Sequence, residues 1–421
     1  MSHDYDVIVI GAGAVGENAA DYATRGGLKV ALVENELVGG ECSYWACMPS
    51  KALLRPGAAL HAALSVEGSK QAIPSEARLD VPAVLARRDA ATSHWDDSGQ
   101  AKWVKSANID LVRGTAKITD IRKVTVGDTI YNARYAIVAA TGSSAFIPDV
   151  PGLRDAKPWT SLACEMATAY AGFGSKITMV VRGQTLLGGQ EDFAGQFVAE
   201  ALEKLGASIL LNTRPHPNTA DLGVKQFQLP TLPGGWLDVD NSLLVRTTDW
   251  LYAVGDVNGR ALLTHQGKYQ ARAAGSVIAA RALGKTLHTD AWGVHVATAD
   301  IRAVPQVTFT NPEVASVGLM SHIAPQKGIS TRVVDYNLAW LAGSSVYSDD
   351  YKGQARLVVD TDKEVVVGAT FVGPDTGELL HAATIAIVGE ISIGRLWHAV
   401  PSYPTVSEIW LRLLDKYLSE K

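Results

Sequence analysis

Two cysteines, Cys42 and Cys47, carry the clearest chemical signal in this sequence of 421 residues. The chain has 3 cysteines, and the third, Cys164, comes much later, so the first two are a pair by elimination as well as by spacing. On a regular α-helix, residues five positions apart have Cα atoms roughly 8–9 Å apart, beyond the limit of about 7 Å for a disulfide. The helix must therefore be broken or kinked between them if the two sulfurs bond.

The residues around the pair favour redox chemistry over packing. Gly39 and Gly40 precede the cysteines, and Pro49 follows them. Because proline is accepted in the first turn of a helix but not in its interior, we expect regular helix to start just after Cys47, where the helix dipole favours a thiolate. The alternative is two buried cysteines acting as small apolar residues, which the turn-forming glycines and proline disfavour.

A nucleotide-binding pattern opens the chain. The apolar, β-branched run at residues 7–10 predicts a buried parallel strand. A glycine loop follows, then an expected helix at 17–25 and a second strand at 29–34. Glu34 closes that strand 23 positions after Gly11, close to the spacing of a ribose ligand. The loop glycines are Gly11, Gly13 and Gly16. This context favours a dinucleotide, with its pyrophosphate at the helix amino end, over an ordinary βαβ turn with convenient glycines.

The cysteine pair indicates which dinucleotide binds. It begins eight residues after Glu34, so it would lie close to the reactive end of the nucleotide. A nicotinamide ring moves a hydride, whereas a flavin can pass two electrons to a disulfide through a covalent thiol adduct. The combination predicts FAD.

At this point the chain resembles the pyridine nucleotide-disulfide oxidoreductases, the family of dihydrolipoamide dehydrogenase, glutathione reductase and mercuric reductase. The resemblance rests on the segments 39–51, 140–142, 250–256 and 305–318. It implies an α/β fold with a Rossmann-like FAD domain, a nicotinamide-type domain and an α+β dimerisation domain. By the family's order, residues 1–160 and 245–300 form the FAD-binding domain, 161–244 an NAD(P)H-binding domain that is incomplete in this sequence, and 301–421 the dimerisation domain.

The resemblance also implies roles for individual residues. Cys47 becomes the thiolate that faces the flavin, and Cys42 becomes the outer thiol that attacks an acceptor. Lys51 becomes the cation near the flavin N5 edge, with Glu165 as its partner, and Asp256 holds the ribityl chain. The other cofactor-binding candidates are Gly11, Gly13, Gly16, Glu34, Thr141, Gly142 and Arg182.

The middle segment departs from the family's pattern. A nicotinamide domain should open with its own strand and glycine loop, and neither is present between Trp159 and Lys176. Either a true deletion has crippled the nucleotide site, or the sequence omits loops that the intact protein has. We favour the second interpretation, because a helix without its strand leaves an apolar face with nothing to pack on. It predicts gaps near residues 161–163 and 212–216 much wider than the usual Cα spacing of about 3.8 Å.

Arg182 bears on which nicotinamide nucleotide would bind if this domain is whole. Val181 stands where the first nucleotide site has Glu34, and Arg182 follows it. A missing carboxylate beside an arginine suits a 2′-phosphate better than a bare ribose. The pattern therefore leans toward NADPH over NADH.

The second departure concerns the catalytic base. The family places a histidine, donated across the dimer, five residues before a glutamate. This chain keeps the glutamate as Glu408 but has Tyr403 at the histidine position. Tyrosine has a reference pKa of about 10, so it is a poor general base near neutral pH, although it can donate a hydrogen bond or a proton. Tyr403 and Glu408 are thus catalytic candidates beside the two cysteines.

Aromatic residues surround both motifs. Tyr44 and Trp45 lie between the cysteines, and Trp397 and Trp410 flank Tyr403. They could hold a planar acceptor such as a quinone by stacking, or they could pack in the dimer interface. The sequence supports the two alternatives equally.

Composition narrows the remaining function classes. The net charge of −5 gives no electrostatic reason to expect a nucleic-acid partner, and no apolar run approaches the roughly 18 residues of a membrane-spanning helix. Three cysteines are too few for a secreted disulfide framework. We therefore expect a cytoplasmic protein with no membrane partner and no metal site.

Together these features predict a homodimeric, FAD-dependent NAD(P)H oxidoreductase. Electrons would pass through a Cys42–Cys47 disulfide to a disulfide or another small-molecule acceptor. One alternative is a flavin-dependent reductase of quinones or other electrophiles in which the disulfide is auxiliary. The other is a flavin-binding dimer that has lost nicotinamide binding and is not an enzyme.

Overall fold

The computed structural model covers residues 1–421 and describes residues 2–144, 155, 158, 162–181, 185–211, 216–217, 222 and 224–420. The chain forms two compact units. The first comprises residues 1–49, 88–161 and 214–301, and the second comprises residues 50–87, 162–213 and 302–421. Each unit has its own hydrophobic core.

The first unit is built on a seven-stranded sheet. Its strands are β1 (Ser2–Ile10), β2 (Val30–Glu34), β3 (Asp110–Arg113), β4 (Ala116–Asp120), β5 (Lys123–Val126), β6 (Thr129–Ala139) and β13 (Leu251–Ala253). They follow the order β3-β2-β1-β6-β5-β4, and β13 pairs with the carboxyl end of β6. The pairs that involve β1, β2, β3 and β13 are parallel, whereas β4, β5 and β6 form an antiparallel meander.

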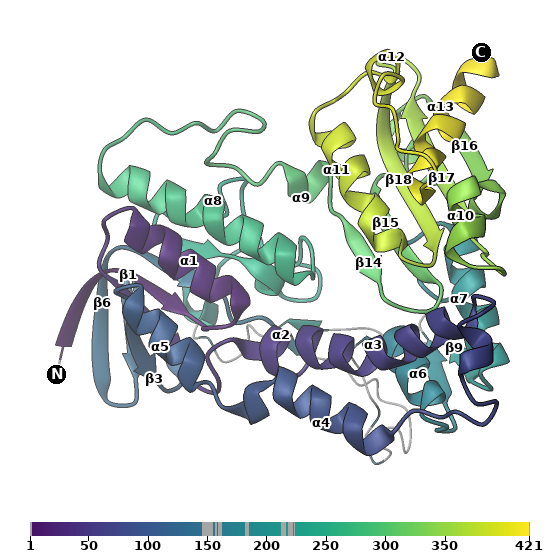
Figure 1. Ribbon diagram of the computed structural model, residues 1–421. Coiled ribbons are helices and arrows are strands. Elements are labelled where there is room, and N and C mark those ends of the chain that lie inside the picture. The colour runs from purple at the N-terminus through teal and green to yellow at the C-terminus, as the bar shows by residue number, and fades with distance from the viewer. Residues whose placement is uncertain are drawn as a thin grey trace. The chain divides into compact units, whose positions relative to one another are not determined.

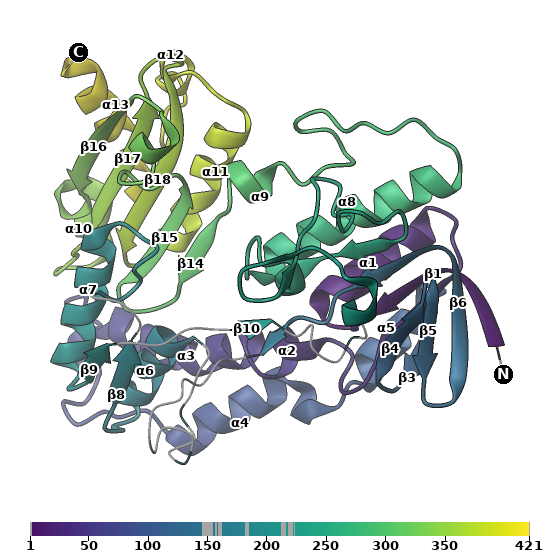
Figure 2. The same cartoon turned by 180° about the vertical axis from the view of Figure 1, so that it is seen from behind.

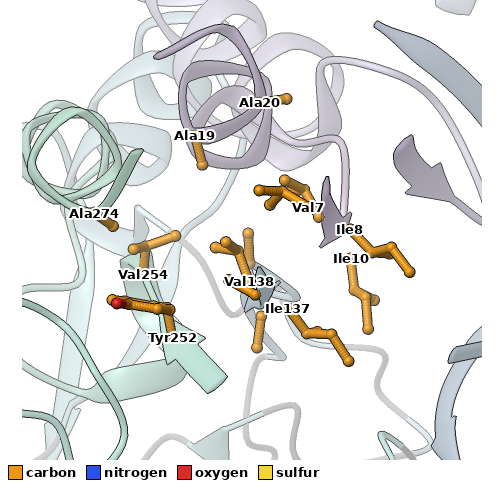
Figure 3. Close-up of a cluster of buried hydrophobic side chains, with 14 of the residues drawn as sticks. Val7, Ile8, Ile10, Ala19, Ala20, Ile137, Val138, Tyr252, Val254 and Ala274 are labelled. Carbon is orange, nitrogen blue, oxygen red and sulfur yellow. The ribbon is translucent and has the colours of Figure 1, made fainter. Parts of the chain in front are cut away.

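Two helices cover this sheet, α1 (Ala14–Arg25) and α8 (Thr264–Ala282), and they lie side by side (Figure 1). The β-branched run in β1 is fully buried at Val7, Ile8 and Val9, as predicted for a parallel strand. Figure 3 shows this core, with Ala19 and Ala20 of α1 above the strand residues. The predicted strand–loop–helix–strand order is confirmed, although β1 starts earlier than expected, at Ser2, and α1 starts earlier, at Ala14.

The second unit contains a five-stranded antiparallel sheet of order β14-β15-β18-β17-β16. Its strands are β14 (Gln306–Thr308), β15 (Glu313–Gly318), β16 (Thr331–Asn337), β17 (Gln354–Asp360) and β18 (Val365–Gly373). Helix α11 (Leu380–Val388) packs against β15 and β18, and α13 (Ile409–Ser419) packs against β16 and β17 (Figure 2).

The segment expected to form a nicotinamide domain is a small α/β layer in the second unit. It consists of α6 (Ala163–Gly172), β8 (Thr178–Val181), α7 (Asp192–Lys204) and β9 (Ser208–Leu211). In the described part of the chain, β8 and β9 pair only with each other, in parallel. Their core includes Val314 of β15 and Val372 of β18, so this layer shares its hydrophobic core with the five-stranded sheet.

This shared core bears on the hypothesis of omitted loops. We expected α6 to lack anything to pack on, but its Cys164 and Ala167 belong to the core that contains Val314 and Val372. The packing reason for that hypothesis is therefore removed. The Cα gaps expected near residues 161–163 and 212–216 involve residues 161 and 212–215, which lie outside the described residues, so the hypothesis itself stays a prediction.

The remaining helices complete the two units. They are α2 (Gly40–Tyr44), α3 (Cys47–Leu64), α4 (Val81–Ala91), α5 (Ser98–Ser106), α9 (Ala299–Arg302), α10 (Ala342–Tyr347) and α12 (Ile393–Leu396). No helix in the described part of the chain is long and apolar enough to cross a membrane.

A buried ion-pair network joins the small layer to the five-stranded sheet. Arg356 on β17 donates from Nε and Nη2 to the two carboxylate oxygens of Asp335, each at 2.7 Å. Its Nη1 donates to Glu191, which caps α7, at 2.9 Å. The side chain of Glu191 is 2% exposed, and Ser321 also donates to it from its backbone N–H and its hydroxyl.

Because Arg356 satisfies a buried carboxylate, Arg356→Leu is expected to lower the free energy of unfolding by about 3 kcal/mol. Urea denaturation followed by circular dichroism measures this loss. Lys363→Leu, in an exposed turn after β17, is the matched control and should stay within about 0.5 kcal/mol of the parent. Equal losses in the two variants would contradict the role of the network.

Candidate active site

The glycine loop between β1 and α1 forms a cradle with two positions, Gly11 and Gly16, that only glycine fits. Gly11 has a φ of +98°, and a Cβ added there would lie 2.4 Å from the carbonyl oxygen of Ala140. A Cβ on Gly16 would lie 1.8 Å from the carbonyl oxygen of Gly11. Gly13 caps the amino end of α1. The loop therefore leaves the helix end open to a diphosphate, as the sequence pattern predicted.

Glu34 ends β2 beside this loop and is buried. Its Oε2 accepts the backbone N–H of Ala12 at 2.6 Å, and its Oε1 accepts the backbone N–H of Glu36 at 2.8 Å. The carboxylate thus braces the glycine loop, which the sequence analysis missed. Each oxygen keeps a further lone pair for a hydroxyl group, so the position still suits a ribose. Arg182, the candidate for a second nucleotide site, lies outside the described residues.

Asp256 lies at the same edge of the sheet. It follows β13, and the Ser143 hydroxyl donates to its Oδ2 at 2.7 Å. Burial raises the pKa of the Asp256 carboxyl, and the bond from Ser143 opposes this rise. Thr141 and Gly142 follow β6, the parallel neighbour of β13. The structure therefore brings these candidates together, and Ser143 is an addition to them.

The two cysteines lie where one helix ends and the next begins. Helix α2 ends at Tyr44 and α3 begins at Cys47, so the predicted break is confirmed and the new helix starts at Cys47 itself. The structure holds the two cysteines as reduced thiols, and both are half-buried. Cys47 Sγ lies 3.3 Å from Thr264 Oγ1, at the first turn of α8. Thr264 is a site residue that no local sequence pattern indicated.

The two thiols are not equivalent. The hydrogen bond from Cys42 to Cys47 is the largest cause of a raised pKa at Cys42, followed by burial and by the charge of Cys47. Cys47 instead lies at the amino end of α3, where the helix dipole favours a thiolate. Cys164 differs from both, because it is buried in the second unit and burial raises its pKa to about 11.

The expected lysine–glutamate pair is present in the second unit. Lys51 Nζ lies 2.7 Å from Glu165 Oε2, and Glu165 Oε1 accepts the backbone N–H of Phe309 at 3.1 Å. The Lys51 ammonium also lies 4.6 Å from the centre of the Phe309 ring. The side chain of Glu165 is 3% exposed, so the pair fixes the direction of the half-exposed lysine.

Tyr403 and Glu408 are not brought together. Tyr403 is 75% exposed, whereas Glu408 is 3% exposed. Glu408 Oε1 lies 3.8 Å from Arg412, and its Oε2 has no hydrogen-bond partner. Within the described residues of one subunit, no hydrogen bond or ring contact links the two candidates. A catalytic role for either one depends on a partner subunit.

The aromatic residues divide between packing and exposure. Tyr44 is buried, and its ring lies 5.7 Å from that of Trp45. Trp410 packs on Phe371 at 6.3 Å. Tyr44 and Trp410 therefore pack inside the subunit, which is neither of the two alternatives. Trp397 is 49% exposed, so it is available to a partner subunit or to an acceptor.

The fold and the site define a class, namely nucleotide-binding α/β proteins with a dithiol beside the glycine loop. Three family models identify the class further. Residues 5–162 and 161–228 match models described as pyridine nucleotide-disulphide oxidoreductase, and residues 304–413 match the dimerisation domain of that family. The chain belongs to the pyridine nucleotide-disulphide oxidoreductases, which are enzymes whose members bind FAD and NAD(P)H.

Individual relatives agree with this assignment. Mercuric reductase from Staphylococcus aureus is 26% identical over 466 residues, covering 96% of this chain and 81% of that protein. Dihydrolipoyl dehydrogenase from Rhizobium etli is 26% identical over 489 residues, covering 99% of each. Among solved structures, the HOCl-induced flavoprotein disulfide reductase RclA from Escherichia coli matches in fold, with a TM-score of 0.77 and 20% identity over 98% of this chain and 99% of that chain. Both sequence alignments are longer than this chain, so these relatives have segments that it lacks.

The residues of this chain fit FAD better than they fit a nicotinamide nucleotide. The glycine cradle, Glu34 and the Asp256 edge suit FAD. The nicotinamide segment does not suit its nucleotide, because no glycine lies between Trp159 and Tyr170 to form a phosphate loop before α6. The first turn of α6 instead holds the buried Glu165, which is paired with Lys51.

Proposed function

We propose that this chain is an FAD-dependent oxidoreductase in which Cys42 and Cys47 exchange two electrons with the bound flavin and with a disulfide or another small acceptor. The observation that carries the proposal is the contact of Cys47 with both Cys42 and Thr264 where α3 begins. Bound FAD supplies a two-electron redox centre beside this dithiol. The match to the dimerisation domain supports a homodimer.

The dithiol chemistry follows from the unequal thiols. After Cys42 loses its proton, its sulfur attacks one sulfur of a substrate disulfide, forming a mixed disulfide and releasing the other substrate sulfur as a thiolate. Cys47 then attacks Cys42 Sγ, which closes the protein disulfide and releases the second substrate thiolate. Cys47 suits the second step because Thr264 and the amino end of α3 stabilise its anion.

Other residues hold the cofactor in this proposal. Gly11, Gly13 and Gly16 admit its diphosphate, Glu34 accepts a ribose hydroxyl, and Asp256 with Thr141 holds the ribityl chain. Lys51, directed by Glu165, places its charge near the flavin. These roles are supported by the cradle geometry and the ion pair described above.

A second candidate function is reduction of quinones or other electrophiles, with an auxiliary dithiol. The exposed Trp397 and Tyr403 favour it, because both offer aromatic surface and Tyr403 stands where the family has a base. Turnover with a panel of disulfides and a panel of quinones separates the two functions. If the chain reduces disulfides, Cys42→Ser should lose disulfide turnover and keep quinone turnover. If the dithiol is only auxiliary, Cys42→Ser should lose neither activity.

The cysteines predict a spectral change in the protein with bound FAD. Partial reduction should give a long-wavelength charge-transfer band from the Cys47 thiolate. Cys47→Ser should abolish this band, whereas Cys42→Ser should show it even without reductant, because Cys47 then has no partner with which to form a disulfide. Absorbance spectra of the three purified proteins test this. If FAD is bound and neither substitution alters the spectrum, the dithiol mechanism is wrong.

The electron donor is a separate prediction. Because the residues before α6 form no phosphate loop, we expect dithiothreitol to reduce the bound flavin, and NADPH or NADH to do so more slowly by on the order of a hundredfold, as for a misplaced reactant. Anaerobic mixing followed by flavin absorbance measures the three rates. Cys47→Ser should remove the reduction by dithiothreitol alone. Fast, saturable reduction by either nucleotide would contradict the expectation.

Tyr403 predicts poor turnover of ordinary disulfides such as lipoamide and glutathione disulfide. A positioned acid–base group contributes about a hundredfold to ten-thousandfold, and tyrosine does not replace histidine as a base. Tyr403→His should raise disulfide turnover if the partner subunit presents this position to Cys42. Tyr403→Phe should impair the natural reaction if the hydroxyl donates a proton. Lipoamide turnover as fast as in histidine-bearing relatives would rule this account out.

A further inference from the structure

The turn that carries Asp256 is held by a buried side chain of α8. Asp256 lies in a short 3-10 helix, Gly255–Asn258, which follows β13 in the first unit. Gln270 of α8 accepts two hydrogen bonds at its Oε1, from the backbone N–H of Gly255 and from the side-chain amide of Asn258, each at 2.8 Å. Gln270 and Asn258 are both 0% exposed. One oxygen atom therefore joins the two ends of the segment that contains Asp256.

Asn258 fixes the same turn to the sheet. Its Nδ2 donates to the carbonyl oxygen of Ala253, the last residue of β13, at 3.0 Å as well as to Gln270. Its Oδ1 accepts the backbone N–H of Arg260 at 3.0 Å. Removing the oxygen of Gln270 would therefore leave the N–H of Gly255 and one N–H of Asn258 buried without that acceptor, which is costly for polar groups away from water.

Helix α8 also lies against the backbone of the turn. A Cβ added to Gly267 would lie 3.2 Å from Gly255 Cα and 2.5 Å from Val15 Cγ2 of α1. Gly255 has a φ of +75°, and a Cβ there would lie 3.2 Å from Val15 Cγ1. Because these glycines bring the backbones close together, the turn packs directly on α8 and α1. Gln270 lies three residues after Gly267, so it is on the same face of α8.

The same helix reaches the dithiol at its amino end. Thr264 is the first residue of α8, and its Oγ1 lies 3.3 Å from Cys47 Sγ. Gln270 follows at a distance of about 9 Å along the helix axis. The helix thus contacts Cys47 at one point and holds the turn of Asp256 at another. The distance between the Cys47 sulfur and the Asp256 carboxylate therefore depends on one continuous element.

We propose that Gln270 is a positioning residue for the flavin. Its amide oxygen holds the Gly255–Asn258 turn on α8, which keeps the Asp256 carboxylate at a defined distance from Cys47, so that a flavin bound by Asp256 lies against that sulfur. Gln270 has no exposed surface with which to touch a cofactor, so it acts through the turn. The inference rests on the proposed function, because it assumes that Asp256 binds FAD.

The test measures FAD binding by the purified holoprotein. Gln270→Met keeps a side chain of similar size but removes the acceptor, so the turn should lose its fixed position. We expect the dissociation constant of FAD, measured by diluting the holoprotein and following flavin fluorescence, to rise about tenfold or more. The charge-transfer band at saturating FAD should weaken, because it requires the flavin to lie against the Cys47 thiolate. Gln270→Glu keeps an acceptor oxygen and should restore both measurements to near the parent values.

Gln266→Met is the matched control. Gln266 is a second buried amide of α8, and it donates to Asp300 Oδ1 at 2.7 Å. Its replacement should lower the stability of the protein without changing the dissociation constant of FAD. Equal weakening of FAD binding in Gln270→Met and Gln266→Met, or no weakening in Gln270→Met, would overturn the inference.

Asn258→Ser tests the same hydrogen bond from the other side and takes the place of Gln270→Met if that variant does not fold. It should also raise the dissociation constant of FAD by about tenfold, and unchanged binding would contradict the inference. A parent protein that does not bind FAD would overturn the proposed function and this inference together. A parent protein with bound FAD and its charge-transfer band, beside unchanged binding in Gln270→Met, would overturn this inference alone.

Discussion

The site depends on the break in the helix between Cys42 and Cys47. An unbroken helix would hold the two residues too far apart to bond, whereas ending α2 at Tyr44 lets the Cys42 thiol reach Cys47. The same break creates a new helix amino end at Cys47. One local feature therefore brings the thiols together and gives only Cys47 a place at the start of the long helix α3, where the helix dipole favours a thiolate.

The parallel sheet brings distant parts of the chain to this dithiol. Ala139 of β6 pairs with Ile10 of β1 on one side and with Ala253 of β13 on the other. Since the carboxyl ends of parallel strands meet at one edge, the glycine loop, Thr141 and Asp256 must gather there. Their positions follow from the register of β1, β6 and β13. No single sequence motif contains this information.

Local sequence patterns therefore predicted the helices, strands and loops of the site better than the side-chain contacts between them. Gly11, the start of α3 and the Lys51–Glu165 pair were recoverable because spacing or resemblance determines them. The bonds from Ala12 to Glu34 and from Ser143 to Asp256, and the contact of Thr264 with Cys47, join residues far apart in sequence and have no periodic signal. The packing of Cys164 and Ala167 of α6 into the core that contains Val314 and Val372 was missed for the same reason.

Two ion pairs lie at helix ends in the segment that was expected to form the nicotinamide domain. The helix ends that could hold a nucleotide phosphate each carry a buried carboxylate, Glu165 in the first turn of α6 and Glu191 at the cap of α7. Lys51 satisfies the first and Arg356 satisfies the second, so both carboxylates bind residues of their own unit. The segment thus packs as a layer of the second unit, against Val314 and Val372 of the five-stranded sheet.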